Sequence, residues 1–199
     1  LANMPGFQVG GRDIDPILLE IMWNRLISIT DEGAATLVRT AFCTNIRESN
    51  DYTCTLMDAN GDSIADNRVG TPSFVGCLPQ TMKHFLKLFP PRTWRPGDVV
   101  ITNDPWIGTG HKPDMVVAMP IFHEENLVAF AGSIAHHADI GGAPWAGDCR
   151  SVFEEGLGVP PTKLLKKGKP NKELLAIIRG NVRLPDLVIG DLFSQVAAA

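Results

Sequence analysis

Residues 115–135 read MVVAMPIFHEENLVAFAGSIA, which is two apolar runs separated by the polar segment His123-Glu124-Glu125-Asn126. Short apolar runs rich in Val, Ile and Phe are typical of buried strands, and polar residues between two such runs favour a turn. We therefore predict strands over 115–122 and 127–135, joined by that turn. A similar run, Val99-Val100-Ile101, predicts a further strand of the same sheet core.

Elements on both sides of this core are predicted from helical spacing and turn residues. Asp15-Pro16 has the form of an N-cap followed by the first helical residue, so a long helix is expected over 16–41, with a weak point at Gly33. The predicted fold class is mixed α+β, an antiparallel β core with a long N-terminal helix and flanking helices. The other expected elements are a hairpin over 52–65, a helix over 78–89, a strand at 163–165 and helices near 171–179 and 186–199.

The composition is that of a soluble globular chain of one domain. The 199 residues are 44% hydrophobic and carry a formal net charge of -4, which argues against nucleic acid as a partner. No apolar run approaches the roughly 20 residues that span a bilayer, and residues 1–11 lack the pattern of a secretory signal. The four cysteines form no C-x-x-C pair and are expected to be free thiols, so the predicted compartment is the cytoplasm.

The two ends of the sequence predict a piece of a larger subunit. The chain starts without Met and stops at Val196-Ala197-Ala198-Ala199, a helix-forming run with no stop signal. We therefore expect residues 1–199 to be the N-terminal portion of a longer catalytic domain.

Four of the five histidines lie between residues 111 and 137, beside Asp-containing turns. His111 and Asp114 are three residues apart, and antiparallel pairing of 115–122 with 127–135 would bring His136 back beside Asp114. Imidazole and carboxylate together suit Zn, Mn or Fe(II), and three protein ligands with an open position are typical of a catalytic ion. The sequence therefore predicts a divalent metal site at His111, Asp114 and His136.

A purely structural interpretation competes with this one. Histidines at strand ends often bond only to neighbouring backbone, and Asp before Gly or Pro is ordinary turn chemistry. Neighbouring strand residues point to opposite faces, so His136 and His137 are not both expected to bind the ion. His137 or Asp139 is the better candidate for acid–base catalysis or for supporting the ligands.

Three other polar segments give weaker indications of function. The run 45–52 follows the long helix and either caps it or reaches a substrate, capping being the commoner role. The pair Glu154-Glu155 either presents a carboxylate near the histidine cluster or is solvated. The segment Gly108-Thr109-Gly110 lacks the features of a P-loop, so no nucleotide site is inferred.

Several blocks in one order resemble the hydantoinase B/oxoprolinase family, which includes N-methylhydantoinase B-type subunits and relatives in acetone and acetophenone carboxylases. The similarity runs from about Asp15 to Leu192, and H-x-P-D followed by H-H-A-D-I-G-G at this separation is its most specific part. The blocks are DPILLE (15–20), RTAF (39–42), NIRESNDY (45–52), NDPWIGTGHKPD (103–114), HHADIGG (136–142), EEGL (154–157) and PPTKL (160–164).

The resemblance implies an enzyme that works beside a hydantoinase A-type subunit, which binds ATP and phosphorylates the substrate. The B-type component would then complete hydrolysis of a cyclic amide such as a hydantoin, a lactam or 5-oxoproline, with water activated at a metal on His111, Asp114 and His136. Protons would be managed by His137 or Asp139. ATP would not bind to this chain, and a hetero-oligomer is expected.

Two rival functions stay open at this point. Carboxylase relatives join activated bicarbonate to a ketone, although they tend to replace the second His and the Ala of H-H-A-D, which this chain keeps as His137-Ala138. A noncatalytic assembly role is the alternative from another class. Many relatives also have a His-containing segment ending in Gly-Ser-Met-Pro where this chain reads GTPSFVGCLP (70–79), which leaves the substrate undecided.

Overall fold

The computed structural model describes residues 7–9, 12–143 and 146–199. In this part of the chain, seven strands form one antiparallel sheet in the order β4-β3-β7-β6-β5-β8-β9. A separate small hairpin, β1 (Phe7–Val9) and β2 (Arg12–Ile14), precedes the first helix. The sheet strands are β3 (Tyr52–Asp58), β4 (Ser63–Asp66), β5 (Val99–Thr102), β6 (Asp114–His123), β7 (Asn126–His136), β8 (Thr162–Lys166) and β9 (Lys169–Pro170).

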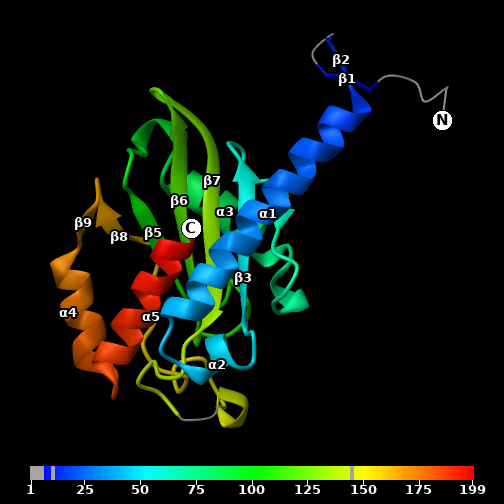
Figure 1. Ribbon diagram of the computed structural model, residues 1–199. Helices are drawn as coiled ribbons and strands as arrows, with labels where there is room; N and C mark the ends of the chain where they lie inside the picture. Colours follow the sequence, from blue (N-terminus) through cyan, green and yellow to red (C-terminus); the bar gives the residue numbers. More distant parts are fainter. Residues whose placement is uncertain (1–6, 10–11, 144–145) are drawn as a thin grey trace.

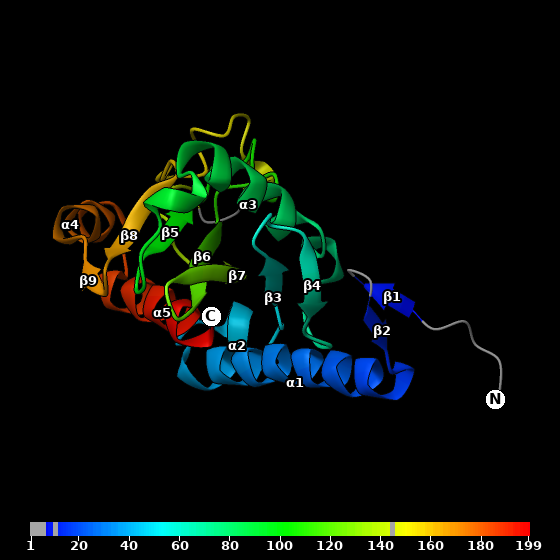
Figure 2. The same ribbon diagram turned by 90° about the horizontal axis from the view of Figure 1, so that it is seen from above.

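Helices cover both faces of this sheet, as Figures 1 and 2 show. The α-helices are α1 (Pro16–Thr40), α2 (Thr44–Arg47), α3 (Cys77–Leu88), α4 (Lys172–Asn181) and α5 (Pro185–Ala198), and short 3-10 turns span Pro72–Phe74, Pro91–Thr93 and Ala146–Asp148. In Figure 2, α1 and α5 lie on one face and α3 on the other. The predicted mixed α+β class with an antiparallel core is therefore confirmed.

The alternation of side chains along β5 and β6 explains why both faces must be covered. Val99 and Ile101 pack into the core beneath α4 and α5, whereas Val100 packs with Phe85 of α3 on the opposite face. Because successive side chains of a strand point to opposite sides, an apolar run without alternation buries both faces. That pattern is what allowed the central strands to be predicted.

The central hairpin agrees closely with its prediction. The β6–β7 ladder runs from Asp114 opposite His136 to His123 opposite Asn126, so Glu124 and Glu125 alone form the turn. Glu124 adopts a positive φ of 55°, which a tight two-residue connection requires. The register of the hairpin is therefore fixed along its whole length. The end away from the turn carries the candidate site.

Helix α1 begins as predicted but differs at Gly33. The Asp15 carboxylate accepts a hydrogen bond from the Ile17 amide (2.9 Å), and Pro16 stands in the first turn. The expected weak point at Gly33 was wrong, because the helix continues through it; a Cβ there would collide with the Ala198 carbonyl of α5. The glycine allows the two helices to approach each other.

The sequence did not predict the β1–β2 hairpin or the short helix α2. Residues 1–6, 10 and 11, within the stretch tested for a secretory signal, lie outside the described residues. Among the helices that the structure describes, none combines the length and the apolar character needed to cross a membrane.

Candidate metal centre

The open end of the β6–β7 hairpin brings the three predicted ligands together. Asp114 is the first residue of β6 and lies opposite His136, the last residue of β7. His111 precedes β6 on a loop in which Gly110 has a φ of 104°. The sequence prediction that antiparallel pairing places His136 beside Asp114 therefore agrees with the structure.

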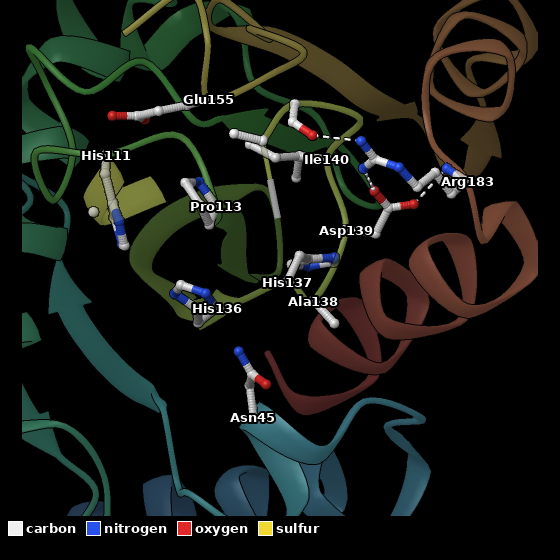
Figure 3. Close-up of a pocket in the computed structure, with 13 residues that line it drawn as sticks. Asn45, His111, Pro113, His136, His137, Ala138, Asp139, Ile140, Glu155 and Arg183 are labelled. Carbon is white, nitrogen blue, oxygen red and sulfur yellow. Dashed lines mark hydrogen bonds and ion pairs between the residues drawn. The ribbon is translucent and has the colours of Figure 1, made fainter. Parts of the chain in front are cut away.

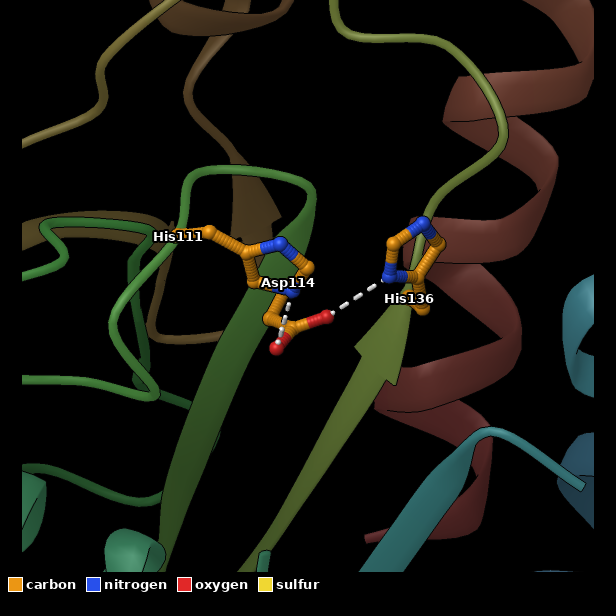
Figure 4. Close-up of side chains that lie close together, drawn as sticks. All are labelled: His111, Asp114 and His136. Carbon is orange, nitrogen blue, oxygen red and sulfur yellow. Dashed lines mark hydrogen bonds and ion pairs between the residues drawn. The ribbon is translucent and has the colours of Figure 1, made fainter. Parts of the chain in front are cut away.

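The Asp114 carboxylate lies between the two imidazoles, as Figure 4 shows. Its Oδ2 is 2.7 Å from Nε2 of His111, and its Oδ1 is 3.0 Å from Nδ1 of His136. The Asp114 side chain is 1% exposed, compared with 35% for His111 and 22% for His136. The carboxylate is thus the buried floor of the cluster, and both imidazoles keep a side open to ligands.

The electrostatics of the cluster follow from these two contacts. Burial alone would raise the pKa of Asp114, but the hydrogen bonds with His111 and His136 outweigh it and hold that pKa at about 2. The same bond to Asp114 raises the pKa of His111, although burial opposes it. Asp114 is therefore an anion at neutral pH and draws positive charge towards it.

The donor set fits a divalent cation. One ligand atom from each of His111, Asp114 and His136 lies within 4.8 Å of the other two, which is close enough for a single ion to contact all three. Two imidazole nitrogens and one carboxylate oxygen are the ligands that Zn, Mn or Fe(II) accepts, and three protein ligands leave positions for water or substrate. The structure thus contains a possible metal-binding triad.

His137, the first candidate for proton transfer, points away from the triad and is buried against α5. Its Nε2 lies 2.9 Å from Oε1 of Gln195, whose amide nitrogen donates to the Met115 carbonyl (2.9 Å). Because Gln195 presents its oxygen, His137 carries its proton on Nε2. Its Nδ1 has no hydrogen-bond partner among the described residues, and burial lowers its pKa.

Asp139, the second candidate, is held by several donors. Its carboxylate accepts hydrogen bonds from the amides of Gly141 (3.0 Å) and Leu184 (2.9 Å), and from the Arg183 backbone and guanidinium. Burial would raise the pKa of Asp139, but these donors lower it. The contacts tie the loop after β7 to the start of α5.

A cavity of about 420 Å³ opens beside the triad. Figure 3 shows its wall, to which His111 and His136 contribute from one side and Asn45 and Glu155 from other segments. A second cavity of about 480 Å³ also borders His111 and His136 and reaches Asp51. The two imidazoles are therefore accessible from both cavities.

Two acidic residues near the triad belong to segments for which the sequence left a functional and a purely structural role open. Asp51 Oδ2 lies 3.6 Å from Nδ1 of His136, and its Oδ1 accepts a hydrogen bond from the Thr71 hydroxyl (2.8 Å). Glu155 accepts a hydrogen bond from the Lys112 amide (2.7 Å) and lines the first cavity. Strand β3 begins at Tyr52 and pairs with the end of β7. The pairing of these two strands is the feature that could have placed Asp51 near His136.

Residues 15–199 match the hydantoinase B/oxoprolinase family, and the chain belongs to that family. It is 33% identical over 195 residues to the B component of a putative D-/L-hydantoinase from Pseudomonas sp. (strain NS671). That match covers 94% of this chain and 33% of the relative. The family resemblance inferred from the sequence blocks is therefore confirmed.

Solved structures support the same conclusion. The ATP-dependent caprolactamase from Pseudomonas jessenii superimposes with a TM-score of 0.81 at 29% identity, covering 93% of this chain and 32% of that one. A nucleotide-free acetone carboxylase gives a TM-score of 0.83 at 23% identity, covering 92% of this chain and 25% of that one, which shows a shared fold alone. The chain thus spans about one third of the length of the caprolactamase chain and of the hydantoinase component.

Proposed function

We propose that this chain belongs to the metal-dependent component of an ATP-dependent hydrolase that opens cyclic amides. The observation that carries the proposal is the triad of His111, Asp114 and His136, with contacts of 2.7 and 3.0 Å, beside a cavity of about 420 Å³. Hydantoinase and caprolactamase are names of relatives, and both denote cleavage of a ring C–N bond. The substrate class proposed is therefore a hydantoin, a lactam or 5-oxoproline.

The need for ATP follows from the chemistry of the amide. An amide carbon is a poor electrophile, and a phosphoryl group on the amide oxygen makes it a better one. We assign this activation to a hydantoinase A-type partner, because the relative from Pseudomonas is the B component of its enzyme and the caprolactamase is ATP-dependent. The complex is accordingly proposed to be a hetero-oligomer.

A divalent ion held by His111, Asp114 and His136 would supply a Lewis acid that acidifies water or polarises a carbonyl. The chain's own contribution is to hold these ligands: the ladder of β6 and β7 fixes Asp114 opposite His136, and Asp114 orients both rings. The open faces of the two imidazoles border the cavity, where a substrate would be positioned.

We retain His137 and Asp139 as candidates for proton transfer, and the geometry favours His137. The Asp139 carboxylate already accepts four hydrogen bonds, so it lacks a free position for a proton in transit. His137 lines the cavity, and its Nδ1, although buried, has no hydrogen-bond partner among the described residues. Asp139 would then act by holding the loop that carries His137.

The test is to measure ATP turnover by the full-length protein with its A-type partner. Hydantoin, 5-oxoproline and caprolactam are supplied one at a time, and ring opening is measured with phosphate release. Amide-dependent ATP hydrolysis that requires metal would support the proposal. ATP turnover that depends on bicarbonate and a ketone would replace it with carboxylation, and an active complex whose turnover is unchanged by His111→Ala would favour an assembly role.

A further inference from the structure

Glu155 is a carboxylate on the cavity wall that the reaction described above leaves without a role. Its Oε2 accepts a hydrogen bond from the Lys112 amide (2.7 Å), and its Oε1 has no hydrogen-bond partner among the described residues. The described part of the chain also offers it no ion-pair partner, because the ammonium of Lys112 donates instead to the Gly156 carbonyl (2.9 Å). In Figure 3 the Glu155 carboxylate lies on the same side of the cavity as His111.

The backbone around Glu155 holds this carboxylate in place. Gly156 pairs with Gly141 as an isolated antiparallel bridge, and the Leu157 amide donates to the Ile140 carbonyl (2.8 Å). Gly156 has a φ of 121°, and a Cβ at this position would collide with Ile140. The turn that carries Glu155 is therefore fixed to the loop after β7, and the side chain is only partly exposed.

The position of Glu155 is coupled to the metal ligands through neighbouring residues. Lys112, whose amide holds Oε2, directly follows His111, and the loop that anchors Gly156 directly follows His136 and His137. A substrate in the cavity beside His111 and His136 would therefore meet the remaining oxygen of Glu155 at a defined place. A carboxylate only accepts hydrogen bonds, so it selects for a donor.

We propose that Glu155 determines specificity by accepting a hydrogen bond from the ring N–H of the substrate, an inference that rests on the proposed hydrolysis of cyclic amides. Cyclic amides with a free N–H present such a donor beside the carbonyl carbon, and after phosphorylation of the oxygen the protonated imidate nitrogen still presents it, whereas N-alkylated amides and ketones do not. A site built around a buried hydrogen bond strongly rejects an analogue that lacks the partner group.

The same contact affects which bond breaks after water has added to the activated carbon. Expulsion of phosphate from the adduct regenerates the amide and wastes ATP. Breaking the C–N bond instead returns the electron pair to nitrogen, which takes up a proton and leaves as an amine, and the remaining acyl phosphate reacts with a second water to give carboxylate and phosphate. A carboxylate at the nitrogen favours its protonated form, and therefore favours ring opening.

The experiment compares Glu155→Gln with wild type in the full-length protein and its partner, using the ring that wild type opens and its N-methyl derivative. We expect kcat/KM for the N–H substrate to fall about tenfold or more, with a much smaller change for the N-methyl compound. The ATP consumed per ring opened should rise. Glu154→Gln changes the neighbouring exposed carboxylate and is the matched control. It should change neither the preference for the N–H substrate over its N-methyl derivative nor the ATP consumed per ring opened.

Two further measurements keep the outcomes distinguishable. Metal content and circular dichroism establish that Glu155→Gln is folded and loaded, and Glu155→Asp, which keeps the charge, should retain more of the N–H preference than Glu155→Gln. If folded Glu155→Gln kept the wild-type preference for the N–H substrate and the wild-type ATP consumption per ring opened, this inference would be overturned and the hydrolase proposal would stay intact. Failure of wild type to open any cyclic amide would overturn both.

Discussion

Asp114 and His136 face each other across the β6–β7 ladder, and Nδ1 of the imidazole lies 3.0 Å from Oδ1 of the carboxylate. The other carboxylate oxygen of Asp114 meets His111 at 2.7 Å. A single buried carboxylate thus orients two rings that come from a loop and from a different strand. This arrangement makes the contribution of each residue to metal binding separable by mutation.

We predict that His111→Ala, Asp114→Ala and His136→Ala each lose the bound metal. Every substitution removes one of three ligand atoms that lie within 4.8 Å of one another, and two ligands rarely hold a catalytic ion. Elemental analysis of purified full-length protein measures the loss. His123→Ala, at the exposed turn of the same hairpin, is the matched control and should keep its metal. Stoichiometric metal in a folded His111→Ala variant would contradict the assignment.

We predict that metal binding weakens as the pH falls from 8 to 6. The hydrogen bond to Asp114 raises the pKa of His111 above its ordinary value of 6.5, so protons compete with the ion as the pH drops through that raised pKa. Above it the His111 imidazole is neutral and available, and below it protonation of His111 costs about tenfold in affinity per pH unit. Competition with a chelator at several pH values measures the slope. An affinity that is constant over this range would contradict a histidine-containing site.

The sequence predicted the central hairpin and the triad for the same physical reason. The uninterrupted apolar runs gave the two strands, and antiparallel pairing placed the residues that flank them, Asp114 and His136, side by side. His111 was found because it is three residues from Asp114. The role of all three as metal ligands stays a prediction that the measurements above address.

Glu155 and Gly33 show what sequence pattern could not supply. The sequence left open whether Glu155 lies near the histidine cluster or in solvent, because its contacts with Lys112 and those of its turn with Ile140 join loops that have no periodic pattern. Gly33 looked like a helix weakness because glycine lowers helix propensity, yet its lack of a Cβ admits the end of α5. Both depend on tertiary contacts between segments far apart in the chain.

We predict that the pair of Asp98 and Lys163 stabilises the fold and that acid removes this contribution. Burial would raise the pKa of Asp98, but hydrogen bonds from Lys163 Nζ (2.7 Å) and from two backbone amides lower it. The stabilisation is therefore fully present above the unfolded pKa of about 3.9 and is lost as the pH falls through the lower folded pKa.

Denaturant unfolding of Asp98→Asn tests this contribution. We expect a loss of roughly 1–3 kcal/mol at pH 7, which shrinks towards pH 3, because a neutral amide cannot replace the buried carboxylate. Asp186→Asn is the matched control, since its pair with Arg179 is exposed and should contribute little. An equal effect of the two substitutions at pH 7 would contradict the assignment.

We predict that Gly132→Ala destabilises the centre of the sheet by roughly 1–3 kcal/mol. Gly132 lies on β7, where a Cβ would stand 2.7 Å from the Val117 carbonyl of β6 and 2.9 Å from a methyl group of Leu78 on α3. The backbone carbonyl cannot move without disturbing the ladder that also aligns Asp114 with His136, so metal affinity should fall together with the midpoint of thermal unfolding. Gly180→Ala on α4 meets no atom within 4 Å and should instead stabilise by about 0.5–1 kcal/mol, because alanine favours the helix. If both substitutions stabilised the protein, the result would contradict the close packing of α3 against the central strands.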